Sequence, residues 1–119
     1  MVNKYTPEQG DIVMIDFNPQ ASHEQKGRRP AYVASNKDFH DLTKLAIVCP
    51  VTNTIRGFPL HVPLDEKTVT TGAIMCEQVK PLDLEARKAA FVEKAPRHVT
   101  DEVFDILYGS IEKTGERYD

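Results

Sequence analysis

The sequence has no tryptophan, and only two of its 119 residues, Cys49 and Cys76, are cysteines. They lie far apart, form no CxxC pair and each fall within an apolar run, so we expect both to be reduced and buried. No apolar run approaches the ~20 residues that a membrane helix needs, and residues 1–10 lack the apolar region of a secretory signal. These absences exclude a disulfide scaffold, and they indicate one soluble, cytoplasmic domain, residues 1–119, with no membrane partner.

The net charge is also small, at −3, which speaks weakly against a nucleic-acid partner. The charge is unevenly distributed along the chain. Residues 18–58 hold six basic and three acidic side chains, whereas residues 82–119 hold six basic and nine acidic ones. A basic stretch beside an acidic one is compatible with a local surface for an anionic ligand, and also with chance in segments this short.

Hydrophobic periodicity predicts several short strands connected by loops. Pro30 opens the second strand, because proline is tolerated at a strand's first position, and two prolines mark the segment 58–64 as a sheet edge. Asn36 can cap a short helix that runs through Thr43, and residues 82–90 predict another short helix. The expected strands are 11–17, 31–35, 45–51, 58–64, 71–80 and 91–95.

The last predicted element is a longer helix. Thr100 is the expected N-cap, with Val99 and Phe104 spaced as a hydrophobic staple. Residues 114–119 are expected to fray. Short strands followed by a terminal helix predict an α+β domain around a small, barrel-like antiparallel sheet. The helix face that should pack on this sheet follows helical spacing and consists of Val103, Ile106, Leu107, Ser110 and Ile111.

Three segments occur in an order found in one known family. They are GDIVMIDFNP with HEQKGRRP closely after it, CPVTNTIRGFP, and TGAIMCEQVKPLD. In this order they resemble the MazF/PemK toxins of bacterial toxin–antitoxin operons, and the resemblance runs from about Tyr5 to Ile111.

The resemblance implies an α+β fold with a small SH3-like antiparallel β-barrel, short helices and a C-terminal helix. It implies a homodimer that cleaves single-stranded mRNA at specific sequences, independently of the ribosome and without a cofactor. It also implies a MazE-like cognate antitoxin whose C-terminal segment occupies the RNA groove. Operator DNA would be bound only through the antitoxin complex.

Cleavage of RNA without a metal uses the 2′-hydroxyl as an internal nucleophile. One group must accept its proton, cations or N–H donors must stabilise the charge that develops at phosphorus, and an acid must protonate the departing 5′-oxygen. The sequence contains no HExxH pair, no CxxC pair and no other recognisable metal-ligand spacing. We therefore expect no metal, and products with a 2′,3′-cyclic phosphate and a 5′-hydroxyl.

Arg29 is the first candidate for the catalytic cation. It ends a basic loop directly before Pro30, its planar guanidinium can grip two phosphate oxygens, and it aligns with the catalytic arginine of the family's RP step. Thr52 aligns with the threonine that the family uses beside this arginine, although a local bond to the backbone is an alternative role. Arg28 should point away from Arg29, as neighbours in a strand do, and is expected to add RNA affinity only.

The sequence leaves open which group accepts the proton and which donates it. Arg29 is a poor base at neutral pH, because a free guanidinium has a pKa above about 12. His23 and Glu24 lie in the loop that the family places over the active site, and both are candidates for proton transfer. One branch of the family uses an acidic residue as base and an arginine two positions earlier as acid. Here these positions hold Glu77 and Met75, so that scheme cannot operate unchanged, and Glu77 is expected to read bases or order the site.

RNA contacts are expected from polar, basic and aromatic residues in the three motif segments. Phe58 follows a turn and can stack on a base, with core packing as the alternative, whereas Phe17 is expected in the core. The predicted RNA-binding residues are Gln25, Lys26, Arg28, Asn53, Arg56, Phe58, Glu77, Gln78 and Lys80.

Two other functions fit the same fold. A CcdB-like toxin inhibits gyrase by protein–protein contact, and it needs neither Arg29 nor Thr52 in these motifs. An inactive relative would only bind its antitoxin and act as a corepressor, and the intact motifs argue against that. An endoribonuclease is therefore the preferred interpretation.

Overall fold

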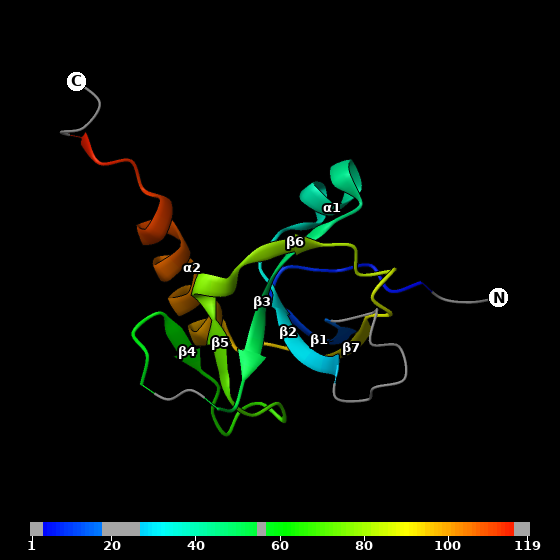
Figure 1. Ribbon diagram of the computed structural model, residues 1–119, viewed down its shortest axis with the longest axis horizontal. Coiled ribbons are helices and arrows are strands. Elements are labelled where there is room, and N and C mark those ends of the chain that lie inside the picture. Colours follow the sequence, from blue (N-terminus) through cyan, green and yellow to red (C-terminus); the bar gives the residue numbers. More distant parts are fainter. Residues whose placement is uncertain (1–3, 18–26, 55–56, 116–119) are drawn as a thin grey trace.

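A computed structural model describes residues 4–17, 27–54 and 57–115 of the chain. Within these residues, seven antiparallel strands form one strongly bent sheet, accompanied by two α-helices and the 3₁₀ turn η2 (Cys76–Gln78) (Figure 1). The helices are α1 (Lys37–Thr43) and α2 (Arg97–Ile111). The strands are β1 (Asp11–Asp16), β2 (Arg28–Val33), β3 (Ala46–Thr52), β4 (His61–Pro63), β5 (Ala73–Met75), β6 (Lys80–Leu82) and β7 (Ala90–Lys94).

β3 is the centre of the sheet, because it pairs with three other strands. One of its edges pairs with β2 at residues 48–50. The opposite edge pairs with β6 at residues 46–48 and with β5 at Val51 and Thr52. The strand order is β4-β5-β3-β2-β1-β7, with β6 off this path. The proline-marked segment 58–64 thus contains β4, which lies at the edge of the sheet as predicted.

The predicted single strand at 71–80 is wrong. The chain forms β5, turns through η2 and continues as β6. β5 and β6 pair with opposite ends of β3, so the chain must step along β3 between them. η2 supplies this step, and it presents Glu77 and Gln78 at the surface of the molecule.

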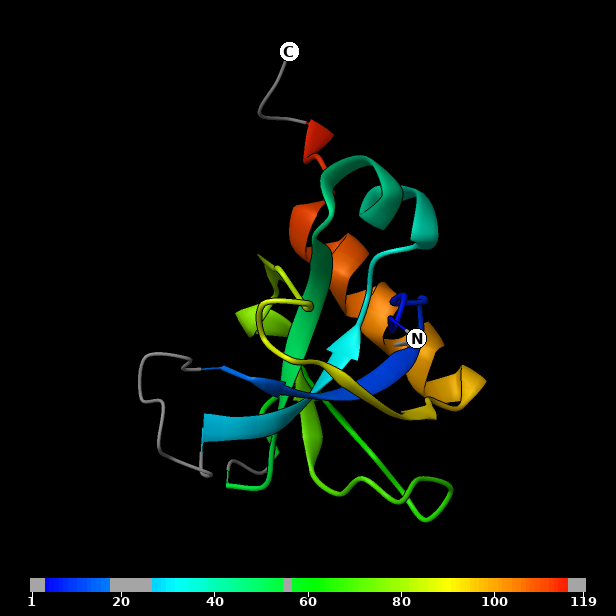
Figure 2. The same cartoon turned by 90° about the vertical axis from the view of Figure 1, so that its right-hand side faces the viewer.

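Alternating side chains along β1, β2 and β3 divide the core into two clusters, one on each face of the sheet. α2 covers the first face (Figure 2), where its Val99 and Val103 pack on residues such as Ile12 and Tyr32. Cys49 and Cys76 belong to this cluster and are buried and unbridged, which confirms that part of the prediction. The cluster on the second face contains Val13, Ile15, Ala31, Val33, Ala46, Val48 and Leu84.

The predicted start of α1 is confirmed, whereas the predicted start of α2 is wrong. Asn36 caps α1 as expected, since its Oδ1 accepts a hydrogen bond from the Phe39 amide at 3.0 Å. α2, however, begins after Pro96, whose fixed φ of −62° suits a helix entrance. Thr100 is therefore inside the helix, where its hydroxyl is bonded by the Tyr32 hydroxyl at 2.8 Å. No helix of the described residues is long and apolar enough to cross a membrane.

A short helix at 82–90 is also a wrong prediction. Residues 84–88 form consecutive turns between β6 and β7, and Leu84 is buried in the second cluster. Lys88 has a φ of +55°, a left-handed conformation that ends any helical continuation. The turns return the chain to β7, the expected short strand near residues 91–95.

The ends of the sheet approach each other without pairing as strands. The described strands form an open path from β4 to β7. The loop between β4 and β5 is tied to β7 through Glu93, whose carboxylate accepts hydrogen bonds from the Val69 and Thr70 amides and the Thr70 hydroxyl. The α+β fold thus contains an open, curled antiparallel sheet in place of a closed barrel. The Glu93 side chain links the two ends of this sheet.

Candidate functional site

Five of the residues predicted to act at the site lie outside the described residues. They are His23, Glu24, Gln25, Lys26 and Arg56. The remaining candidates lie on β2, on η2 and β6, and at and beyond the end of β3. Their geometry determines which of them form one site.

Arg29 lies within β2 and not at the end of a loop, because the strand starts at Arg28. Pro30 is thus the third residue of the strand, and it lies beyond the last β2–β3 pair, so its missing N–H breaks no bond to β3. Arg29 lies opposite Ile15 of β1 and is exposed. Among the described residues, nothing pairs with its guanidinium, which leaves five N–H donors for a ligand.

The register of the sheet brings Arg29 and Thr52 to one face. Ala31 of β2 lies opposite Pro50 of β3, the last pair of that ladder. Extending the same register by two residues puts Arg29 across from Thr52. Both side chains then lie on the face of the second cluster, because residues two positions apart in a strand share a face.

Arg28 has different surroundings from its neighbour. Its guanidinium donates to Asp16 Oδ1 at 2.9 Å and to the carbonyl oxygens of Met14 at 3.2 Å and Lys88 at 3.0 Å. Arg28 therefore ties β1 to the turn before β7. Its predicted contact with RNA stays a prediction, and these three bonds indicate a structural role.

Thr52 ends β3 in a buried position, with 7% of its surface exposed. Its hydroxyl accepts a hydrogen bond from the Thr54 amide at 3.2 Å and shares another with the Thr54 hydroxyl at 2.9 Å. The local bond considered from the sequence is thus present. Gly72 packs on the Thr52 backbone so closely that an added Cβ would lie 2.4 Å from the Thr52 carbonyl oxygen.

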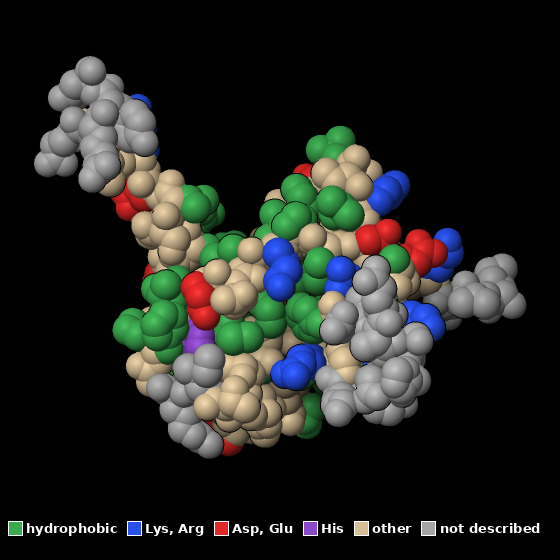
Figure 3. All heavy atoms as spheres, in the orientation of Figure 1, with side chains coloured by type: hydrophobic (Ala, Val, Ile, Leu, Met, Phe, Trp, Pro, Cys, Tyr) green, Lys and Arg blue, Asp and Glu red, His purple; other side chains and the backbone are tan. Residues whose placement is uncertain are grey.

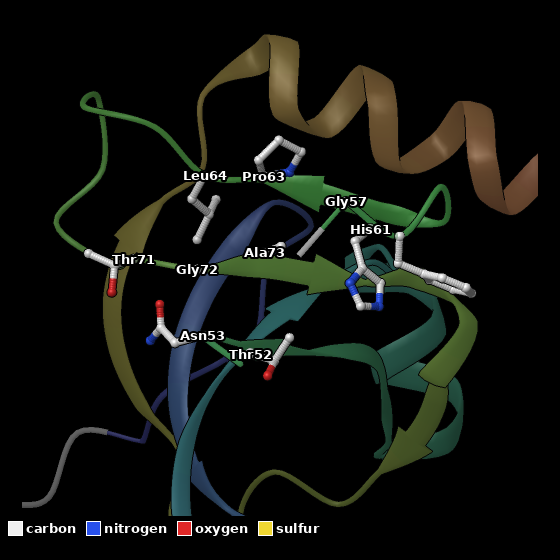
Figure 4. Close-up of a pocket in the computed structure, with 10 residues that line it drawn as sticks. Thr52, Asn53, Gly57, His61, Pro63, Leu64, Thr71, Gly72 and Ala73 are labelled. Carbon is white, nitrogen blue, oxygen red and sulfur yellow. The ribbon is translucent and has the colours of Figure 1, made fainter. Parts of the chain in front are cut away.

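Thr52 lies in the wall of a hollow of about 470 Å³. In Figure 4, the His61 imidazole reaches from β4 across β5 toward the end of β3, where Thr52 and Asn53 lie. The hollow is lined by Thr52, Asn53, Gly57, Phe58, His61, Pro63, Leu64, Thr71, Gly72 and Ala73.

His61 is a residue of this hollow that the sequence analysis did not single out. Its Nε2 donates to Glu77 Oε2 at 3.0 Å, and only 4% of its side chain is exposed. The Phe58 ring meets the imidazole edge to face at 4.9 Å and is itself 42% exposed. The segment FPLHVPL contains the signal, a single polar residue in an apolar strand, but its partner Glu77 is sixteen residues away.

Lys80 is a cation on the same face as Arg29. It lies opposite Val48 of β3, and its ammonium group is 5.6 Å from the centre of the Phe17 ring. Phe17 packs partly against the second cluster, as its predicted core role requires. Figure 3 shows separate lysine and arginine side chains over the region where Figure 1 places β2, β3 and β6.

Comparison with known proteins places this geometry in a family. Residues 8–110 match the model for the PemK-like, MazF-like toxin of type II toxin–antitoxin system. Endoribonuclease PemK from Escherichia coli is 35% identical over 104 residues, which cover 84% of this chain and 78% of that protein. Endoribonuclease toxin ChpB from Escherichia coli K12 is 37% identical over 117 residues, which cover 94% of this chain and 100% of that protein.

Solved structures agree with the sequence comparison. A crystal structure of MazF from Deinococcus radiodurans has 35% identity and a TM-score of 0.80, covering 92% of this chain and 100% of that one. A crystal structure of MazE–MazF from the same organism has 30% identity and a TM-score of 0.80, covering 93% and 100%. The chain belongs to the PemK/MazF family of toxins of type II toxin–antitoxin systems.

Proposed function

We propose that this protein is an endoribonuclease toxin that cleaves single-stranded RNA at specific sequences and is neutralised by a cognate antitoxin. The observation that carries the proposal is that Arg29, whose guanidinium pairs with no other described residue, lies on the same face of the sheet as Thr52. Both stand in the segments by which the sequence resembles the MazF/PemK toxins, and relatives 35% and 37% identical to this chain are named endoribonucleases. A cytoplasmic location, where mRNA is present, follows from this substrate.

The proposed reaction needs no metal. The 2′-oxygen attacks the adjacent phosphorus and loses its proton to a base, while the bond to the 5′-oxygen breaks and that oxygen takes up a proton. The products are a 2′,3′-cyclic phosphate and a 5′-hydroxyl. Arg29 would stabilise the charge on the non-bridging oxygens, and Thr52 would donate to one of them after exchanging its bond with Thr54. His23 and Glu24 stay the candidates for proton transfer.

Incubation of the purified protein with a long single-stranded RNA and EDTA tests this function. We expect cleavage at a recurrent sequence, with 5′-hydroxyl ends that polynucleotide kinase labels directly. Cleavage that stops with EDTA and returns with magnesium would contradict the metal-free route. Binding to gyrase without RNA cleavage would favour the CcdB-like alternative, and antitoxin binding alone would favour the inactive one.

We also propose that a MazE-like antitoxin inhibits the protein by laying its C-terminal segment in the RNA groove. Relatives solved as MazE–MazF complexes support an antitoxin partner. Arg29 and Lys80, which form no ion pair with the carboxylates that the structure describes, suit an acidic segment that competes with RNA. The same protein would act as a homodimer and would meet operator DNA only through the antitoxin complex.

A further inference from the structure

We propose that His61 and Glu77 form a base-reading subsite, in which the Glu77 carboxylate accepts hydrogen bonds from an amino-bearing nucleobase. The inference rests on the proposed endoribonuclease function and names what one part of the site selects. It starts from a pairing that joins β4 to η2, two elements that approach each other only in the folded sheet.

His61 positions the carboxylate and does not itself reach a ligand. Its Nε2 is bonded to Glu77 Oε2, and its Nδ1 is fully buried without a partner among the described residues. The side chain of Glu77 is 25% exposed, compared with 4% for His61. The group that a ligand can contact is therefore the Glu77 carboxylate, and the hydrogen bond from His61 fixes its orientation.

The surroundings of Glu77 suit a base better than a phosphate. Within the described part of the chain, no lysine or arginine pairs with this carboxylate, so its negative charge repels phosphate. The Phe58 ring, 42% exposed, also contacts His61 and offers a surface on which a base can stack. A hydrogen-bond acceptor and an aromatic ring thus both contact the same buried histidine.

An ionised carboxylate only accepts hydrogen bonds, and this determines which bases it selects. Guanine offers two adjacent N–H donors on its pairing edge, and adenine and cytosine each offer an amino group. Uracil offers one imino N–H between two carbonyl oxygens, which repel a carboxylate. A good side chain–base pair discriminates by roughly 5- to 150-fold. The subsite therefore selects guanine, adenine or cytosine and rejects uracil.

Glu77→Gln provides a sharp test, because it exchanges one acceptor for a donor at constant shape. His61 Nε2 would bond the amide oxygen and leave the amide NH₂ to face the base, where it can donate to a uracil carbonyl. The measurement is kcat/KM for RNA oligonucleotides in which each position of the cleaved sequence carries each of the four bases in turn. We expect Glu77→Gln to lose roughly 5- to 150-fold of discrimination against uracil at one position only.

Two further variants complete the design. His61→Phe keeps a ring beside Phe58 and removes the bond to Glu77, so it should relax the same position to a smaller degree. His98→Phe is the matched control, because His98 donates to Asp65 at 2.7 Å in another histidine–carboxylate pair outside the hollow. We expect His98→Phe to leave the base preference unchanged.

Three results with Glu77→Gln would overturn the subsite. They are an unchanged base preference, an equal loss at every position, and relaxation at a position where the unaltered protein prefers uracil. Should His61→Phe fail to fold, Glu77→Gln decides alone. If the unaltered protein cleaves no RNA at all, the proposed function fails and the subsite fails with it.

Discussion

Arg28 and Arg29 are neighbours in β2, yet only Arg29 is left without a partner among the described residues. We predict that Arg29→Ala lowers kcat by about 10²–10³ or more, since it removes a charged contact with the transition state. Its thermal transition should move little, because an exposed side chain contributes little to the core.

Arg28→Ala is the matched control, with the opposite expected profile. It removes three hydrogen bonds that join β1 to the turn before β7, so it should cost about 1–3 kcal/mol of stability while kcat stays near that of the unaltered protein. Thermal denaturation and cleavage kinetics on both variants test the assignment. A larger fall in kcat for Arg28→Ala would reverse the roles of the two residues.

At the scale of elements, β5 lies against the end of β3 because residue 72 is glycine. Gly72 has a φ of +109°, and a Cβ there would meet the Thr52 carbonyl oxygen at 2.4 Å. We predict that Gly72→Ala destabilises the protein by about 1–3 kcal/mol and reduces cleavage, because β5 and Thr52 must move apart. Gly109→Ala is the control: Gly109 is inside α2 in open space, so alanine should stabilise by about 0.5–1 kcal/mol. Urea denaturation measures both, and equal effects would contradict the packing argument.

Glu93 joins the two ends of the sheet, and its contribution to the stability of the fold should depend on pH. Partial burial raises the pKa of Glu93, but hydrogen bonds from the Thr70 hydroxyl and from the Thr70 and Val69 amides lower it by more. A lowered pKa in the folded state means stability that is present above the ordinary value and is lost as the pH falls through the lowered one. Glu93→Ala should therefore cost about 1–2 kcal/mol at neutral pH and less in acid. An equal cost at both pH values, from urea denaturation, would contradict this.

Sequence patterns correctly predicted the helices and strands that are determined by interactions between residues close together in the chain. The β-forming residues of β1, the apolar run of β3 and the Asn36 cap of α1 were all predicted from local sequence. The errors occurred where contacts distant in sequence decide the structure. Thr100 has the chemistry of an N-cap, but Pro96 starts α2 a turn earlier and Thr100 bonds Tyr32 instead.

In the candidate site, too, the residues in short motifs were predicted and the residue that depends on a distant contact was not. Arg29 and Thr52 were identified through their motifs, since each motif is a short run of residues. His61 was missed because its significance depends on Glu77, which β4 and η2 bring to it through the bending of the sheet. The break of segment 71–80 into β5, η2 and β6 had the same cause, because the step along β3 is visible only in the pairing.

The whole molecule exposes an apolar surface on α2 that a monomer would leave in water. Tyr108 is 67% exposed, and Ile111, which the helical spacing predicted to pack on the sheet, is 81% exposed at the end of α2. We predict a homodimer at micromolar concentration that buries this surface. Ile111→Lys should weaken the dimer by about tenfold or more in Kd, whereas Leu42→Lys, an equally exposed site on α1, should not. Sedimentation velocity measures this, and a monomeric unaltered protein would refute it.

RNA affinity should depend on salt although the whole chain carries a charge of −3. Phosphate binding follows the cations that touch phosphates, and Arg29 and Lys80 share one face of the sheet. With two to four phosphates engaged, log K against log salt should fall with a slope of roughly −1.5 to −3 for a single strand. Lys80→Ala should make the slope shallower by about 0.7, while Lys37→Ala, whose lysine pairs with Asp41 on α1, should not. Fluorescence anisotropy with a non-cleavable 2′-deoxy substrate measures the slope. A flat line would mean that stacking and base contacts dominate binding and that the basic face does not contact phosphate.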